Sequence, residues 1–128
     1  MLIKDLISAA AGRSTEAVPL FWWQGWSSRW YVTTVHSLEG FSCREPAMFV
    51  VARKEADGTR TPLLVGAAED VSDALYNECG DALLRAIKAG AREIHLHFAA
   101  PDGEEREAAA GDVAAGWRME AHRPPVHA

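Results

Sequence analysis

The sequence predicts an α/β chain of the α+β sandwich type, in which helices cover a short and mostly antiparallel sheet. Three observations support this fold class. Residues 30–36 alternate along a strand pattern, two apolar runs flank an Asp57-Gly58 turn, and helical patterns lie on both sides of a further alternating segment. An order of strand, hairpin, two helices, strand and helix is typical of a small domain in which helices pack on a sheet.

Length and charge limit what this chain can be. Its 128 residues and 48% apolar content suit one domain with one ordinary core. The net charge of -5 opposes non-specific attraction to phosphate backbones, so a nucleic-acid partner is not expected. Asp5 interrupts the first apolar stretch too early for a secretory leader, and no stretch approaches the ~20 apolar residues of a membrane helix. We therefore expect a cytoplasmic protein that does not insert into membranes.

Residues 2–11 have the pattern of a short amphipathic helix that ends at Gly12. The apolar positions recur at helical spacing and are Leu2, Ile3, Leu6, Ile7 and Ala10. About ten residues make only a marginal helix in isolation, so we expect this helix to dock on another surface. That surface is either this protein's own core or another protein. Residues 12–20 are interpreted as a linker.

An aromatic segment follows the linker, and we group it with the N-terminal helix as residues 1–29. The large aromatic side chains of this region and of the start of the next strand are Phe21, Trp22, Trp23, Trp26, Trp30 and Tyr31. Tryptophan buries a large area and also favours interfaces, where its indole N–H keeps a polar partner. Packing within the protein and a protein interface are both open. Stacking of nucleic-acid bases is disfavoured, because Arg29 is the only basic residue between Arg13 and Arg44.

The predicted domain spans residues 30–117 and begins with a strand and a hairpin. Residues 30–36 form the first strand, since aromatic and β-branched residues alternate there. Strands over residues 47–54 and 61–65 pair as a hairpin, because the Asp57-Gly58 pair suits the positive backbone angles of a tight turn.

Three helices are predicted after the hairpin. Acidic residues where a helix starts and Gly90 where a helix stops indicate helices over residues 70–76 and 81–89. Residues 104–116 form a last, alanine-rich helix, and Trp117 is placed to anchor its end on the core.

A strand over residues 92–98 separates the second helix from the third. It alternates so that His95 and His97 share one face, which we expect to be polar and partly covered. His36, on the first strand, could join them as a zinc ligand, but a zinc site needs three or four ligands with a second shell. We therefore expect no bound metal.

The remaining features carry little chemistry. Residues 118–128 have no pattern and are interpreted as a flexible tail. Cys43 and Cys79 lack a Cys-x-x-Cys neighbour, so two buried thiols are expected, with one disulfide as the alternative. The chain has no glycine-rich phosphate loop and no nucleophile elbow, so we expect no cofactor.

Several local matches resemble the GIY-YIG nuclease superfamily over about residues 30–117. The family's signature strands would fall on Ala47-Met48-Phe49 and Leu64-Val65-Gly66. Residues 90–97 resemble a strand entry of small bacterial relatives, and Arg106 and Asp112 suit the family's last helix. The resemblance implies a GIY-YIG-like fold in which Gly66 is the retained backbone feature.

The resemblance also implies where catalytic groups would lie. The family's enzymes use two tyrosines, an arginine and a metal-binding glutamate as a unit. The residues at these positions are Phe49, Leu64, Ala74 and Ala110. None of them can bind a metal or activate water, so we expect no enzyme activity and no catalytic residue. The alternative for the last position is a displaced metal carboxylate, with Glu104, Glu105 and Glu107 upstream and Asp112 two residues away.

These observations lead to two functional hypotheses. The first is a catalytically inactive GIY-YIG-like domain that serves as a protein-binding or structural module, such as an accessory subunit of a larger complex with an unidentified protein partner. Its candidate interface residues are Leu2, Leu6, Phe21, Trp22, Trp23, Trp26 and Trp30. The alternative is a nucleic-acid-binding pseudo-nuclease without cleavage activity. Its candidate residues are Arg53, Lys54, Arg60, Arg85, Lys88 and Arg92.

Overall fold

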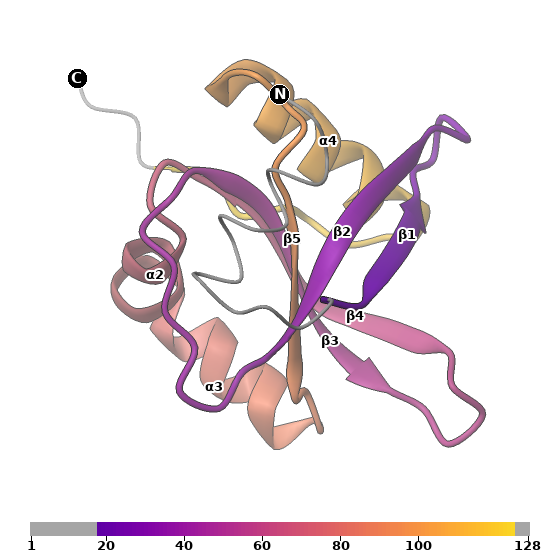
Figure 1. Ribbon diagram of the computed structural model, residues 1–128, viewed down its shortest axis with the longest axis vertical. Coiled ribbons are helices and arrows are strands. Elements are labelled where there is room, and N and C mark those ends of the chain that lie inside the picture. Colours follow the sequence, from indigo (N-terminus) through magenta and orange to yellow (C-terminus); the bar gives the residue numbers. More distant parts are fainter. Residues whose placement is uncertain (1–17, 125–128) are drawn as a thin grey trace.

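One curled antiparallel sheet organises residues 18–124, the part of the chain that the computed structural model describes (Figure 1). Its strand order is β1-β2-β5-β3-β4, and every strand pair is antiparallel. The strands are β1 (Leu20–Gln24), β2 (Trp30–Ser37), β3 (Ala47–Lys54), β4 (Arg60–Ala68) and β5 (Glu93–His97). The antiparallel sheet predicted from the sequence is confirmed.

Helices cover both faces of this sheet, which confirms the predicted α+β class. Helix α2 (Val71–Asp73) begins after the N-cap Asp70, continues as the π-helical turn η1 (Ala74–Glu78), and leads into α3 (Gly80–Lys88). Helix α4 (Gly103–Gly116) begins after the N-cap Asp102 and packs mainly on β4. Figure 1 shows α2 and α3 on one side of the sheet and α4 on the other.

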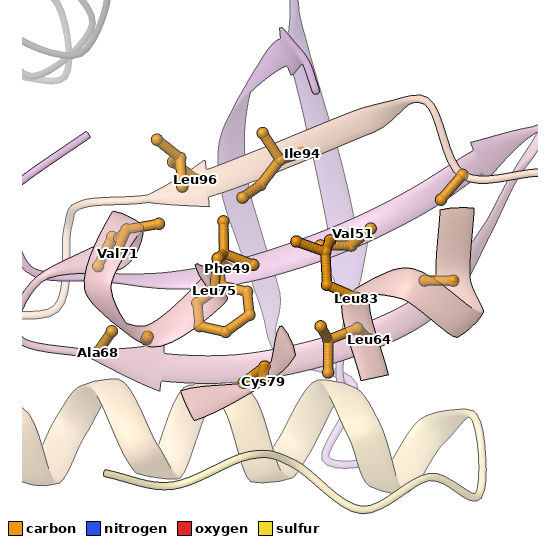
Figure 2. Packing of buried hydrophobic residues seen from close by; sticks show 14 residues of the cluster. Phe49, Val51, Leu64, Ala68, Val71, Leu75, Cys79, Leu83, Ile94 and Leu96 are labelled. Carbon is orange, nitrogen blue, oxygen red and sulfur yellow. The ribbon is translucent and has the colours of Figure 1, made fainter. Parts of the chain in front are cut away.

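The two faces of β3 separate two hydrophobic cores. All residues from Ala47 to Ala52 are fully buried, because alternate side chains face α2–α3 and α4. Figure 2 shows the first core, in which Phe49 faces Leu75 and Val71. The second core joins the other face of β3 to α4. Its buried residues are Trp23, Tyr31, Met48, Val50, Ala52, Val65, Ala67, Ala109, Ala110, Val113 and Ala114.

The hairpin forms as predicted, with a longer second strand. Gly58 adopts a φ of 90°, which accounts for glycine in this turn. β4 extends to Ala68, because small apolar side chains continue its pairing with β3. The register shifts between Val51 and Ala52, opposite Pro62, which has no N–H for the ladder.

Strand β1 was not predicted. The run Phe21-Trp22-Trp23 does not alternate between apolar and polar residues, so its two-residue period was hidden. In the structure Trp23 is buried while Trp22 is half exposed, and Trp22 pairs with Val32 of β2. The aromatic segment therefore forms a strand of the same sheet as β2, although the sequence placed a boundary between an N-terminal segment and the domain at residues 29 and 30.

The segment after α4 is held against β4 rather than free, which corrects the expectation of a flexible tail for residues 118–124. The backbone N–H of His122 donates to the carbonyl of Val65 at 2.8 Å, and its carbonyl accepts from Ala67 at 3.2 Å. Met119 and Ala121 pack on the second core. The segment adopts this place because the edge of β4 offers backbone donors and acceptors that need partners.

Candidate interaction surface

The predicted interface residues fall into three groups. Leu2 and Leu6 lie outside the described residues. Trp23 is buried at 3% exposure in the second core, and Phe21 is half-buried and packs against that core. The exposed group consists of Trp22, Trp26 and Trp30, with 51%, 76% and 57% of their surfaces exposed.

These tryptophans border an open groove of about 900 Å³. The groove lies between β1, the turn into β2, the β3–β4 turn and the end of α4. Its lining residues include Phe21, Trp22, Trp26, Trp30, Arg60 and Trp117. Trp117 is 45% exposed, and its ring centroid lies 6.2 Å from that of Trp23. Trp117 was expected only to anchor the end of the last helix on the core, and its position at the end of that helix was the available signal for a place on the surface.

Asp112 fixes the turn that presents Trp26. Its carboxylate accepts from the backbone N–H of Ser27 at 2.9 Å, the Ser27 hydroxyl at 2.6 Å and the Tyr31 hydroxyl at 2.9 Å. A side chain at Gly25 would place its Cβ only 2.0 Å from this carboxylate, so glycine is required there. Burial opposes ionisation of Asp112, but the hydrogen bonds from Ser27 outweigh it and hold its pKa below the usual value. The Asp112 carboxylate, which was considered as a metal ligand, thus holds the turn between β1 and β2 in place.

A buried hydrogen-bond chain lies beneath the groove. The Trp23 indole N–H donates to Nδ1 of His95 at 2.9 Å, and His95 Nε2 lies 3.0 Å from Oε1 of Glu93. Arg60 donates to both Glu93 oxygens at 3.0 and 3.3 Å, and its guanidinium lies 5.0 Å from the Phe21 ring centroid. Because Nδ1 accepts, His95 is neutral with its proton on Nε2.

The histidines do not converge on one site. His95 is fully buried and His97 is 7% exposed, so their face is covered more completely than the sequence suggested. β1 and α4 account for this, because the curled sheet encloses that face. His36 pairs with Ile94 and lies on the opposite face from His95, whose partner is Val35. Within residues 18–124, no group of three metal-ligating side chains occurs.

Acidification is expected to destabilise the fold. Burial lowers the pKa of His95, His97 and His36 below the ordinary histidine value of about 6.5. The unfolded chain therefore binds more protons below about pH 6.5, so stability is complete above this pH and falls as pH drops towards the folded-state values. Urea unfolding should give a smaller free energy at about pH 5 than at about pH 7.5. Equal values would contradict this assignment.

The cysteines are free thiols rather than a disulfide. Cys79 is buried in the first core, and Cys43 is half-buried at its margin. Burial raises the pKa of Cys79 to about 11 and also raises that of Cys43. Neither thiol is therefore activated as a nucleophile or metal ligand at neutral pH.

The candidate nucleic-acid residues do not form one free basic patch. Arg53 pairs with Glu55 at 2.9 Å, Arg60 pairs with Glu93, and Arg92 donates to the carbonyls of Ile87 and Ala91. The three with neither an ion pair nor a side-chain hydrogen bond in the described part of the chain are Lys54, Arg85 and Lys88. Half of the candidate basic side chains are therefore already bound to carboxylates or carbonyls of the same protein.

The four positions that the resemblance assigned to catalytic residues do not meet at one place. Phe49, Leu64 and Ala74 lie in the core between the sheet and α2–α3. Ala110 lies in the core on the opposite face. Arg106 is also buried, and its Nη2 donates to Glu69 at 2.8 Å. All four positions fill space in hydrophobic cores rather than line an open cleft.

Comparisons identify no relative: no protein-family model, curated protein or solved structure matches the chain. Between residues 18 and 124, the helices are too short or too polar to cross a bilayer.

Proposed function

We propose that this chain is a catalytically inactive, GIY-YIG-like protein-binding or structural module, such as an accessory subunit of a larger cytoplasmic complex. The exposed tryptophans beside the groove carry this proposal. Trp22, Trp26, Trp30 and Trp117 each leave about half or more of a large apolar side chain in water. Concentrated aromatic surface of this kind marks protein interfaces, where tryptophan supplies much of the binding energy.

The rigidity of the groove supports the same proposal. Asp112 clamps the turn that carries Trp26, and the backbone N–H of Trp26 donates to the Asp112 carbonyl at 2.9 Å. Trp117 contacts the buried Trp23. A turn whose backbone is held in this way loses little backbone freedom when it binds, so more of its contact energy appears as affinity.

Burial of the catalytic positions supports the absence of activity. Hydrolysis of a phosphodiester needs an activated water and positive charge at the phosphate, and Phe49, Leu64, Ala74 and Ala110 supply neither. Incubation with supercoiled DNA and magnesium is expected to leave the DNA intact. Nicking by the wild type that is lost in Asp112→Asn would overturn this part of the proposal.

The described charges favour a protein partner over a nucleic acid. The net charge is -5, and Arg53, Arg60 and Arg92 already have partners inside the protein. A nucleic-acid interface would need a basic groove along which phosphates bind. Binding of DNA or RNA that weakens steeply as salt increases would favour the alternative.

Affinity capture from the native host tests the interface. Baits are the wild type, the double variant Trp22→Ala/Trp26→Ala, and the control Tyr76→Ala/Leu84→Ala, whose residues are 49% and 52% exposed on η1 and α3. We expect a partner whose affinity falls by about 30-fold or more in the tryptophan variant, because an interface hot spot contributes at least about 2 kcal/mol. The control should bind normally. Equal binding by all three baits would reject this surface as the interface.

A further inference from the structure

Another open cavity, of about 440 Å³, lies on the side of the sheet that α4 covers. It is bordered by the start of β2, the end of β5, the connection from β5 to α4 and the first half of α4. Its volume falls in the ~300–1,000 Å³ range of small-molecule sites. Part of its wall consists of small side chains that leave this space open, namely Ala99, Ala100, Ala108 and Ala109.

His97 presents an unpartnered ring nitrogen to this cavity. Its Nδ1 lies 2.7 Å from the carbonyl oxygen of Val32. A carbonyl can only accept, so Nδ1 carries the proton and Nε2 has a free lone pair. No residue between 18 and 124 donates to Nε2. Because every buried side-chain nitrogen and oxygen in this range has a partner, Nε2 is accessible, and His97 lines the cavity.

The His97 imidazole is held in place and uncharged. His97 is only 7% exposed, and its ring lies edge-on to that of Tyr31, with the ring centroids 5.4 Å apart. The Tyr31 hydroxyl in turn donates to Asp112 at 2.9 Å. Burial lowers the pKa of His97, so its ring is neutral at neutral pH and Nε2 acts as an acceptor. His95 differs, because both of its ring nitrogens have partners inside the protein.

Two opposite charges line the same cavity. Arg29 and Glu105 are exposed, and neither forms an ion pair in the part of the chain that the structure describes. A guanidinium binds carboxylates through paired hydrogen bonds, whereas a carboxylate binds ammonium groups. A ligand with only one charge would be attracted by one of these residues and repelled by the other. The cavity therefore suits a molecule that carries both charges.

We infer that this cavity binds a small zwitterion with an ammonium and a carboxylate group, as in a free amino acid. Arg29 donates to the carboxylate, and Glu105 and Nε2 of His97 accept from the ammonium group. The alanine wall contacts the apolar part of the ligand. A few polar groups of this kind fix the orientation of a small molecule, while the apolar wall supplies contact area.

The site is independent of the proposed function. Trp30 borders both the cavity and the groove, but Arg29, His97 and Glu105 line only the cavity. Substitutions at the latter residues therefore leave the groove intact.

Nuclear magnetic resonance of the full chain with isotope-labelled histidine tests the site. The probes are the free standard amino acids, added one at a time at neutral pH. We expect at least one to bind saturably with a Kd of about 1 mM or tighter and to shift the Nε2 resonance of His97. The His95 resonances should stay in place, because both of its nitrogens already have partners.

Two pairs of variants locate the binding. Arg29→Gln should weaken it about tenfold or more through loss of a hydrogen bond to a charged group, whereas Lys88→Gln on α3 should bind normally. Ala108→Leu fills the cavity and should abolish binding. Ala115→Leu makes the same change at an exposed position of α4 outside the cavity and should bind normally. Unchanged amide shifts of β3 residues confirm that each variant folds.

Analogues of the bound amino acid test the need for both charges. Its amide lacks the carboxylate and its N-acetyl derivative lacks the ammonium group, so each should bind about tenfold or more weakly.

Four outcomes would overturn the inference. They are an unmoved His97 Nε2 resonance with every amino acid, equal affinities for Arg29→Gln and Lys88→Gln, equal affinities for Ala108→Leu and Ala115→Leu, and an analogue that binds as tightly as the free amino acid. None of them bears on capture of a protein partner by the groove, so the proposed function stands or fails separately.

Discussion

Glu93→Ala is expected to lower the free energy of unfolding by about 2–4 kcal/mol, because it leaves a guanidinium and a buried imidazole without their acceptor. Glu93 accepts two hydrogen bonds from Arg60 and one from His95, and the Arg60 and Glu93 side chains are only 17% and 18% exposed. Urea unfolding followed by circular dichroism at neutral pH measures the change.

Glu55→Ala is the matched control. Glu55 also accepts from an arginine, Arg53, but that pair is much more exposed, at 33% and 37%. Solvent screens such a pair, so the control should lose far less stability. Similar losses in the two variants would show that the Arg60–Glu93–His95 chain is no more important than a surface pair. A second control, Glu93→Gln, keeps an acceptor and should recover part of the loss.

Gly66→Ala is expected to destabilise the protein by about 1–3 kcal/mol through overpacking. An added Cβ would lie 2.6 Å from the Phe49 ring and 3.0 Å from Cβ of His122. Both neighbours are fixed, since Phe49 is fully buried and His122 is hydrogen-bonded to β4. The resemblance to GIY-YIG nucleases implied a backbone requirement at this glycine, and the structure gives it a physical cause in the close approach of the ring.

Two further variants, Gly111→Ala and Phe49→Leu, test whether the clash with the Phe49 ring causes the loss in Gly66→Ala. Nothing lies within 4 Å of the Cβ position at Gly111 in α4, so alanine there should be neutral or stabilising by up to about 1 kcal/mol. Phe49→Leu removes the clashing ring edge, and the double variant Phe49→Leu/Gly66→Ala should lose less than the sum of the single losses. Additive losses would contradict the proposed clash.

Local sequence signals predicted most of the fold. Asp57-Gly58 between apolar runs indicated the hairpin, and Asp70 and Asp102 lie at helix starts where acidic side chains cap the backbone. Contacts between distant residues were not predictable in this way. The Arg60–Glu93 pair and the docking of His122 on β4 depend on how the sheet curls, which no short pattern encodes.

The candidate surface was likewise only partly predictable, because it also depends on contacts between distant residues. Sequence composition identified the tryptophan-rich region but could not separate core from surface, because Trp22 and Trp23 are adjacent residues of one chemical type. Strand alternation in the structure makes that separation, with Trp23 inside and Trp22 outside. Trp117 joins the groove through the packing of α4. Residues far apart in sequence thus form one surface.

The docking of His122 makes the two ends of the sheet unequal. At β4, the chain's own C-terminal segment occupies backbone groups near Gly66, whereas β1 has only β2 as a strand neighbour among the described residues. Growth of a filament by strand addition requires one molecule's β1 to meet the next molecule's β4, and that contact is obstructed at Gly66. The docked segment therefore opposes the addition of a further strand at this part of the β4 edge.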